Sequence, residues 1–393
     1  MSIHPAVSKA LILPSLALSQ LVSWGTLYYA FAVLSTGIQQ DLGGSAEAVN
    51  GAFSLSFLLW GLTTYPVGLL AQRYGARSVL LLGMFLTAGL FFFLRGIDSL
   101  VGLYITWAWL GAAMAMTLYE PAFAAIVQSF PEGHRRRIGW ITVVGGLAST
   151  TFWPLSHLLE TTIGWRNTFA VFGGMHLVAG LFLLCFLPVP RLETSKGHSE
   201  KRGSNAVDTT LLRLTACFAI YGFITAAVPV QLIAILRAQG LDAVPALAWA
   251  ALVGPMQAMA RGADLLLANR WKPRWVGVLT FTLMPFSLVA LWLAEGQSIL
   301  NGAFVTAYGI GLGLLTIVRA SAPLELFGPH AYARHSGALN VPWVLARSAG
   351  PIGSTLVLGM VGSQQSLVVV MTIAALLGSA LYISANTSNR GAA

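Results

Sequence analysis

Residues 68–95 read GLLAQRYGARSVLLLGMFLTAGLFFFLR. A short basic turn at 72–77 is followed by a run from Val79 to Leu94 that contains no charged residue. A helix needs about 20 mainly apolar residues to cross a bilayer, and the run lacks the alternating pattern of a barrel strand. The stretch therefore predicts the end of one membrane helix, a tight turn and a second membrane helix.

The rest of the chain repeats this pattern. Hydrophobic residues make up 56% of the 393 residues and charged residues only 9%, against roughly 25% charged in soluble domains. With about 20 residues per span, we expect transmembrane helices at 11–37, 47–71, 79–95, 100–127, 139–158, 166–188, 210–236, 246–268, 275–294, 298–327, 335–361 and 365–385. The composition excludes a soluble fold and predicts an all-α polytopic membrane protein with twelve transmembrane helices.

Basic residues are distributed unevenly between alternate loops. If the N-terminus is cytoplasmic, the inner loops and tails hold Lys9, Arg73, Arg77, Arg135, Arg136, Arg137, Arg191, Lys196, Lys201, Arg202, Arg270, Lys272, Arg274, Arg334 and Arg390. The outer loops hold only Arg95, Arg166 and Arg237. Positive charge accumulates on the cytoplasmic side. We therefore expect a bacterial inner (cytoplasmic) membrane protein with both termini inside, and the net charge of +9 does not indicate nucleic-acid binding.

The longest polar segment divides the expected helices into six and six. We expect an N-terminal six-helix bundle at 1–190, a cytoplasmic linker at 191–209 and a C-terminal six-helix bundle at 210–393. Pro131 and Gly139, after the fourth helix, recur as Pro329 and Gly337 after the tenth. A duplicated six-helix unit is a common plan of transporters, which hold their substrate between the two halves.

The turn at 68–77 resembles the signature loop of the major facilitator superfamily, and Gly164-Trp165-Arg166 is also frequent there. The resemblance implies two six-helix bundles around a central cavity lined by the first, fourth, seventh and tenth helices. It also implies a gating loop formed by Gly68, Arg73, Gly75 and Arg77.

A narrower resemblance concerns the first helix. Trp24-Gly25, followed by GIQQDLG at 37–43, is similar to the start of members of the monocarboxylate-porter-like branch. This resemblance hints at transport of organic anions.

Charged residues within the expected helices are few. A charge at the centre of a membrane helix costs roughly 2.5–3.5 kcal/mol, so it needs a partner, water or a function. Glu120 in the fourth helix and Arg319 in the tenth occupy equivalent positions in the two halves. We expect Glu120 to carry protons and Arg319 to bind substrate. The alternative is a structural salt bridge near the cytoplasmic end.

The second half holds two further arginines. Arg261 lies three residues before Asp264 and four after Gln257, so the three share a helix face. Arg347 follows Trp343 by four residues. We expect Gln257, Arg261, Trp343 and Arg347 to bind substrate and Asp264 to carry protons. The alternative is a structural role, in which Arg261 and Asp264 pair with each other and Arg347 packs against a neighbouring carbonyl oxygen.

Aromatic residues with polar tips suit the wall of a cavity. Trp24 and Tyr28 lie four residues apart in the first helix, and Tyr221 lies in the seventh. We expect all three to contact substrate, although packing and the interfacial aromatic belt are the commoner roles for such residues.

The leading hypothesis is a secondary transporter that moves a small organic anion by alternating access, coupled to protons. The arginine excess favours an anion because guanidinium binds carboxylates bidentately. The alternative is a proton-driven efflux pump for drugs or other amphiphilic compounds, against which Trp107 occupies a position where antiporters of the family carry arginine. We expect no enzymatic activity, catalytic residue, metal or cofactor, and a monomer in the bilayer.

Overall fold

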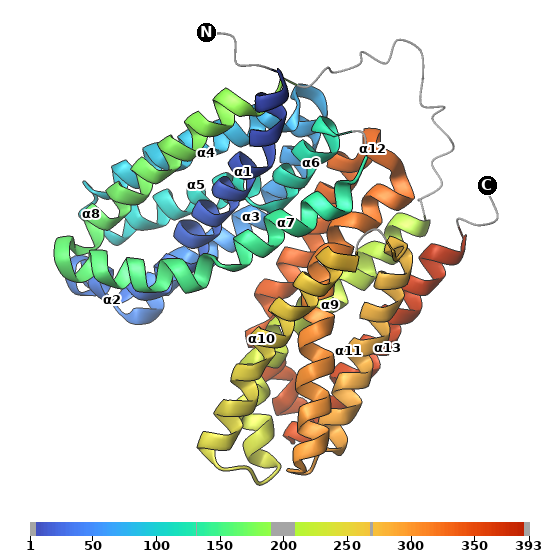
Figure 1. Ribbon diagram of the computed structural model, residues 1–393. Coiled ribbons are helices and arrows are strands. Elements are labelled where there is room, and N and C mark those ends of the chain that lie inside the picture. The colour runs from blue at the N-terminus through green and yellow to red at the C-terminus, as the bar shows by residue number, and fades with distance from the viewer. Residues whose placement is uncertain (1–4, 131, 190–208, 268–269, 389–393) are drawn as a thin grey trace. The chain divides into compact units, whose positions relative to one another are not determined.

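The computed structural model describes residues 5–130, 132–189, 209–267 and 270–388, and these residues form helices and short turns without a strand (Figure 1). Ten helical stretches are long and apolar enough to cross a membrane. One of them, His134–Phe186, is divided at Gly164, whose backbone is not helical. A further helix, Ala243–Leu267, is not among the ten. The division and the additional helix bring the described total to the twelve expected spans.

The first unit comprises residues 1–192 together with 329–341. Its helices are α1 (Pro5–Ser23), the π-helical segment η1 (Trp24–Tyr29), α2 (Ala30–Leu42), α3 (Ala46–Tyr74), α4 (Ala76–Leu94), α5 (Leu100–Thr117), α6 (Tyr119–Ser129), α7 (His134–Gly146) and α8 (Ala148–Phe186). The segments α1, η1 and α2 are continuous and form the first span. The main packing contacts join α3 with α5 and α4 with α8.

The second unit comprises residues 193–328 and 342–393. Its helices are α9 (Thr209–Ala238), α10 (Ala243–Leu267), α11 (Pro273–Leu293), α12 (Ser298–Val361) and α13 (Gln364–Ser388). Helix α12 contains two spans because Gly328 is not helical, and its residues 329–341 pack with the first unit. Helix α13 packs against α9 and α11.

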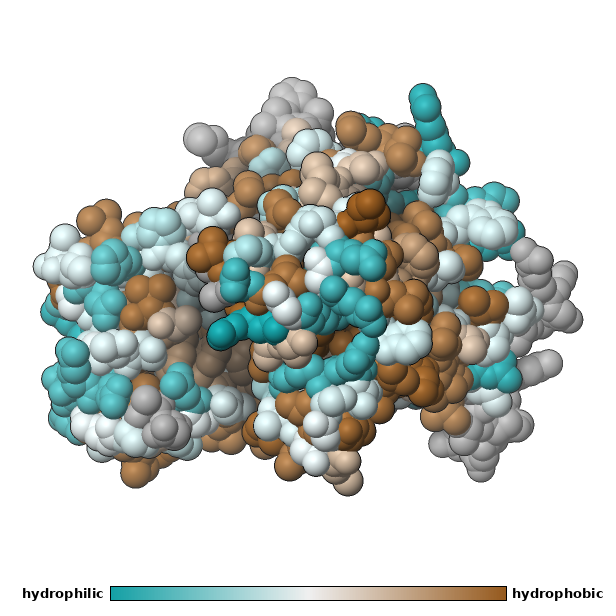
Figure 2. All heavy atoms as spheres, turned by 90° about the horizontal axis from the view of Figure 1, so that it is seen from below, coloured by the Kyte–Doolittle hydropathy of each residue, from teal (hydrophilic) through white to brown (hydrophobic). Residues whose placement is uncertain are grey.

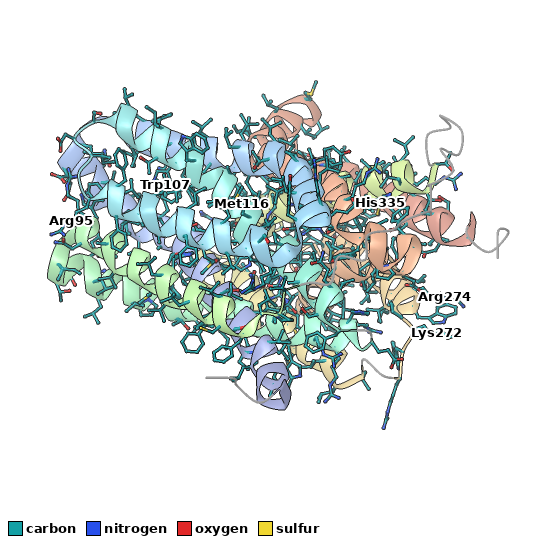
Figure 3. The ribbon with its side chains drawn as sticks, turned by 90° about the horizontal axis from the view of Figure 1, so that it is seen from above. Arg95, Trp107, Met116, Lys272, Arg274 and His335 are labelled. Carbon is teal, nitrogen blue, oxygen red and sulfur yellow. The ribbon has the colours of Figure 1, made fainter. Side chains whose placement is uncertain are left out.

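Aromatic residues fill the core of the first unit. The ring of Trp107 on α5 is fully buried and lies 4.8 Å from Phe31 and 5.2 Å from Phe53. Figure 3 shows Trp107 and Met116 along α5. A Cβ atom at Gly111 would lie 2.3 Å from the Ser56 carbonyl oxygen. This close approach brings α3 and α5 into direct backbone contact.

Large apolar side chains are also found on the outside of both units. Leu82, Phe93, Ile105 and Trp109 in the first unit are exposed, as are Leu266, Ile299 and Leu377 in the second. Figure 2 shows such apolar residues, in brown, over much of the surface in view. An exposed apolar surface of this extent is the arrangement expected of helices that face lipid.

Two details differ from the expected spans. The fourth span is not one helix, because Leu118 is extended between α5 and α6. The first span runs from Pro5 to Leu42 and contains a π-helical turn that the sequence does not predict. The predicted linker at 191–209 lies outside the described residues except for Thr209.

Candidate functional site

Six aromatic rings from three spans of the first unit form one cluster, which we call the aromatic cluster. Its members are Trp24 and Tyr28 from η1, Phe57 and Trp60 from α3, and Tyr119 and Phe123 from α6. Trp24 is central, with ring centroids 5.4 Å from Tyr28, 6.0 Å from Trp60 and 4.8 Å from Tyr119. The indole nitrogens of Trp24 and Trp60 are buried and have no hydrogen-bond partner among the described residues. The cluster therefore combines apolar ring faces with two buried N–H donors.

The π-helical turn η1 sets the direction of Trp24 and Tyr28. It widens the helix by changing the hydrogen-bond spacing, and such turns are frequent at functional sites. A Cβ atom at Gly25 would lie 2.2 Å from the Phe152 ring, so only glycine allows α8 to approach so closely. Thr26 contacts the buried His176 Nε2 at 2.8 Å. Two tight contacts with α8 thus hold the π-turn.

The fourth span is interrupted next to Glu120. Leu118 ends α5 in an extended conformation, and Glu120 lies in the first turn of α6, followed by Pro121. A helix N-terminus favours negative charge. Glu120 also lines a small pocket with Thr64, Gly68, Ala115 and Gly337, among others. The Glu120 side chain is half-buried. It lies at a helix end and borders a pocket that is lined by polar and small side chains.

The turn between α3 and α4 carries the residues expected to form a gating loop. Gly75 has a φ of 85°, which favours glycine. Gln128 on α6 accepts a hydrogen bond from the Ala76 amide at 2.8 Å and donates one to the Ala71 carbonyl oxygen at 3.2 Å. Arg77 donates to the Leu184 carbonyl oxygen on α8. The loop is therefore tied to two other helices of its unit.

Gly68 and Arg73 lie before this turn, in the last part of α3. A Cβ atom at Gly68 would lie 2.6 Å from the Ala333 carbonyl oxygen and 3.3 Å from Gly337, within the segment of α12 that belongs to the first unit. Arg73 lies over the ring of Tyr74 at 5.2 Å. Gly68 thus permits a close helix crossing, and Arg73 contacts an exposed ring.

The second unit contains the three arginines. The Arg319 guanidinium lies 4.0 Å above the ring of Trp343. Arg261 on α10 donates to Thr316 Oγ1 on α12 at 3.4 Å. Arg347 lies close enough to the buried Tyr308 to interact with it electrostatically. Two half-buried arginines, Arg261 and Arg319, therefore contact side chains of α12, and the half-buried Arg347 lies near a third side chain of that helix.

The other expected residues of the second unit differ in their surroundings. Asp264 is buried on α10. The backbone of Gln257 is in contact with α12, because a Cβ atom at Gly313 would lie 2.5 Å from its carbonyl oxygen. Tyr221 is fully buried, and its hydroxyl bonds to the Ala375 carbonyl oxygen at 2.8 Å and to Ser379 Oγ at 2.7 Å. Because Tyr221 packs between α9 and α13 with its hydroxyl satisfied, we do not group it with the arginines.

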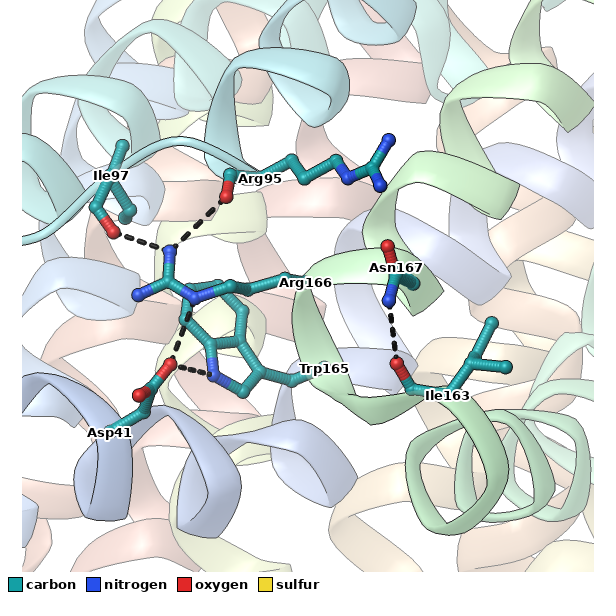
Figure 4. A network of polar contacts seen from close by, with 7 residues as sticks. All are labelled: Asp41, Arg95, Ile97, Ile163, Trp165, Arg166 and Asn167. Atoms are coloured by element: carbon teal, nitrogen blue, oxygen red, sulfur yellow. Dashed lines mark hydrogen bonds and ion pairs between the residues drawn. The ribbon is translucent and has the colours of Figure 1, made fainter.

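The Gly164-Trp165-Arg166 sequence forms a polar network in the first unit (Figure 4). Asp41 Oδ2 accepts hydrogen bonds from Arg166 Nε at 2.8 Å and Trp165 Nε1 at 3.1 Å. Arg166 also donates to the carbonyl oxygens of Arg95 and Ile97. The network joins the end of α2, the α4–α5 turn and the second part of α8.

Sequence reasoning missed Phe57, Trp60, Tyr119 and Phe123 of the aromatic cluster, and Gln128. Phe57 and Trp60 lie in a helix that the resemblance does not place at the cavity. The only available signal was Tyr119 beside Glu120. Gln128 has no signal of its own in the sequence, since its role depends on the turn that α6 meets in the folded unit.

The long apolar helices described above are those of a polytopic membrane protein. The family model of the Major Facilitator Superfamily matches residues 16–351, and the chain belongs to this family. A search of curated proteins found no match.

Three solved structures share the fold over nearly their whole length. The transporter FucP in the outward conformation has a TM-score of 0.76 and 13% identity, covering 96% of this chain and 99% of that one. The proton:xylose symporter XylE has a TM-score of 0.70 and 13% identity, covering 97% and 95%. The human organic anion transporter MFSD10 has a TM-score of 0.68 and 16% identity, covering 97% and 100%.

Proposed function

We propose that the protein is a proton-coupled secondary transporter of a small, carboxylate-like organic anion that works by alternating access. The stacking of Arg319 on Trp343 is the observation that carries this proposal. The Arg319 guanidinium carbon lies 4.0 Å from the centre of the Trp343 ring, and a guanidinium is planar with its N–H donors along its edges. Such an edge binds a carboxylate through two parallel N–H···O bonds. The arrangement suits a planar anionic group.

The charge balance of the second unit supports an anionic substrate. Helices α10 and α12 carry Arg261, Arg319 and Arg347 between residues 243 and 361, besides Arg334 in the segment that packs with the first unit. Their acidic residues over the same range are Asp264 and Glu325. One positive charge is therefore in excess among the three arginines and two acids. Buried charge is costly in a membrane, so an incoming anion gains from this excess.

Glu120 supports the proton-coupling part of the proposal. Its carboxyl group is half-buried at the start of α6 and borders a pocket. A carboxyl group in that position changes its charge when it binds or releases a proton, and ionisable groups inside membrane helices commonly belong to proton relays. Two structural neighbours are proton symporters, FucP for fucose and XylE for xylose. Asp264 is the corresponding candidate in the second unit.

We place the protein in a bacterial inner membrane as a monomer with both termini in the cytoplasm. The support is the distribution of basic residues described above, which marks one side of the membrane. Among the described basic residues, Lys272 and Arg274 lie at the turn between α10 and α11 (Figure 3). Accessibility of introduced cysteines at these positions to an impermeant maleimide in right-side-out and inverted vesicles tests the orientation.

A binding screen by thermal shift tests the substrate class. The purified protein is melted with a panel of small carboxylates, neutral sugars and amphiphilic cations. We expect stabilisation by a carboxylate and its loss in both Arg319→Gln and Arg261→Gln, while Arg274→Gln serves as a matched surface control. Normal stabilisation of both variants by the carboxylate would refute the anion site.

A second candidate function rests on the aromatic cluster. The half-buried rings of this cluster are those of Tyr28, Phe57 and Tyr119, and Tyr119 precedes Glu120 in the chain. Their aromatic faces can attract an amphiphilic cation. This arrangement favours efflux of drugs or other amphiphilic compounds. Stabilisation by cations in the same screen, abolished by Glu120→Gln and unaffected by Arg319→Gln, would favour this function over the first.

A further inference from the structure

Pro121 leaves one carbonyl oxygen of the fourth span without its usual partner. In an α-helix the amide of each residue donates to the carbonyl oxygen four residues earlier. Proline has no amide hydrogen, so Pro121 cannot donate to the carbonyl oxygen of Thr117. In the membrane such a group must find another partner within the protein.

Gln20 on α1 supplies that partner. Its side-chain amide donates to the Thr117 carbonyl oxygen at 2.8 Å, and the Gln20 side chain is fully buried. Thr117 is the last residue of α5, directly before the extended Leu118. The hydrogen bond therefore lies at the break in the fourth span.

The same face of the first span makes a second contact across the break. Trp24 is four residues after Gln20 and lies one helical turn further along. Its ring is 4.8 Å from Tyr119, the first residue of α6. Gln20 thus holds the end of α5 while Trp24 packs against the beginning of α6. The residue between Tyr119 and Pro121 is Glu120.

From these contacts we infer that Gln20 is a positioning residue for Glu120. By satisfying the Thr117 carbonyl oxygen it keeps the fourth span open at Leu118, and the open span places Glu120 in the first turn of α6. The helix N-terminus then favours the charged form of the carboxyl group. This inference deepens the proposed function, because it rests on Glu120 as the proton carrier and names what holds it in place.

The test compares four proteins, each as the full chain in nanodiscs: wild type, Gln20→Met, Pro121→Ala and the double variant. Hydrogen exchange measured by mass spectrometry follows the amides of 117–124. Reaction of Glu120 with dicyclohexylcarbodiimide, which modifies protonated carboxyl groups, reports its charge state. Neither readout needs a substrate, so the results stand whether or not the proposed transport function is correct.

We expect Gln20→Met to speed exchange at 117–124 at least tenfold. The double variant is expected to exchange within twofold of wild type, because Pro121→Ala restores a backbone donor that can bond to the Thr117 carbonyl oxygen. Its Glu120 should still react with the carbodiimide at least fivefold faster than wild type, because the closed helix no longer offers an N-terminus to the carboxyl group. A residue that only stabilises the fold would have both readouts restored together.

Gln231→Met is the matched control. Gln231 is also a buried glutamine, and it bonds to Ser354 in the second unit at 3.1 Å. We expect this variant to leave both readouts at 117–124 and Glu120 unchanged. Wild-type exchange in Gln20→Met, or wild-type carbodiimide reactivity in the double variant, would overturn the inference. If Gln20→Met alone fails to fold and the double variant folds, the pairing of Gln20 with the Thr117 carbonyl oxygen is supported.

Discussion

The fourth and tenth spans carry their charged residues in different settings. Glu120 lies directly after a break at Leu118, whereas Arg319 lies in a stretch of α12 whose first non-helical residue is Gly328. The acid is placed by a helix end, and the arginine by stacking on Trp343. The N-terminus of a helix favours a negative charge near its first turn. Arginine stays positively charged, so the binding role of Arg319 depends on the orientation of its guanidinium group.

The first spans of the two units also differ in the regularity of their backbone. The first span contains the π-turn η1 at Trp24, while α9 is one α-helix from Thr209 to Ala238. Irregular backbone within a membrane helix is tolerated where it is buried in protein or lines a cavity. The irregular segments of the first unit meet at the contact between Trp24 and Tyr119. We therefore propose that the first unit handles the proton and that the second binds the anion.

We expect the largest effect when the Glu120 carboxyl group is removed. A small effect would contradict the proposed difference between the two units. We expect Glu120→Gln to lower transport driven by a pH gradient at least a hundredfold, since the proton carrier is lost. Exchange of substrate across the membrane without net proton movement should continue. Both rates are measured in proteoliposomes with the carboxylate identified by the binding screen.

Glu132→Gln is the control for this variant, because Glu132 is an exposed acid in the turn before α7. Full proton-driven transport by Glu120→Gln would remove the assignment of proton handling to the first unit.

Replacing Arg319 by lysine tests how the second unit holds its cation. Lysine keeps the charge but loses the planar stack on Trp343 and the bidentate edge. A hydrogen bond to a charged group contributes about 1.5–3 kcal/mol, so we expect loss of one bond of the bidentate pair to raise KM about 10- to 150-fold, with a smaller change in maximal rate. Initial uptake rates over a range of substrate concentrations give the KM of Arg319→Lys, with Arg274→Lys as control. An unchanged KM would show that the stack does not serve binding.

Gly25→Val tests whether the π-turn depends on its contact with Phe152. The added side chain would overlap the Phe152 ring, and overpacking of this kind costs about 1–3 kcal/mol of stability. We expect a lower midpoint in a fluorescence thermal melt, and partial recovery when Phe152→Ala is added. If the double variant is as unstable as the sum of the two single variants, the contact does not hold the turn.

The smallest effect is expected at the polar network of Figure 4. Asp41 and Arg166 are 48% and 25% exposed, and exposed ion pairs contribute about 0–1 kcal/mol. We expect Asp41→Asn to lower the melting midpoint only slightly, with Asp98→Asn, an exposed acid of the α4–α5 turn, for comparison. A large loss of stability would mean that this end of the first unit is held chiefly by the Asp41 carboxylate.

The sequence predicts the spans well because length and hydropathy determine them. Turns that need glycine are also visible, as at Gly75 in the signature loop. The break at Leu118 is less visible. Pro121 indicates that a carbonyl oxygen is freed, but not whether the helix bends, breaks or stays straight, because the outcome depends on a donor from another helix.

The candidate site shows the same limit. Trp24, Tyr28, Glu120 and Arg319 could be singled out because charged and amphipathic residues are costly inside a membrane. Gln20, Trp60 and Gln128 could not, because each acts through a partner more than 20 residues away. Tyr221 has the composition of a cavity residue, yet its hydroxyl bonds to α13. Only the packed unit distinguishes these cases.

Proton movement coupled to an anion distinguishes the proposed transporter from a sugar symporter and from an efflux pump for cations. Proteoliposomes that enclose a pH-sensitive dye are mixed with poorly permeant dicarboxylates and other small carboxylates, neutral sugars or amphiphilic cations, with protein-free vesicles as control. We expect a change in internal pH with a carboxylate, and we expect this change to be lost in Glu120→Gln and weakened in Arg319→Lys. A pH change with sugars or cations alone, undiminished in Arg319→Lys, would contradict the proposal.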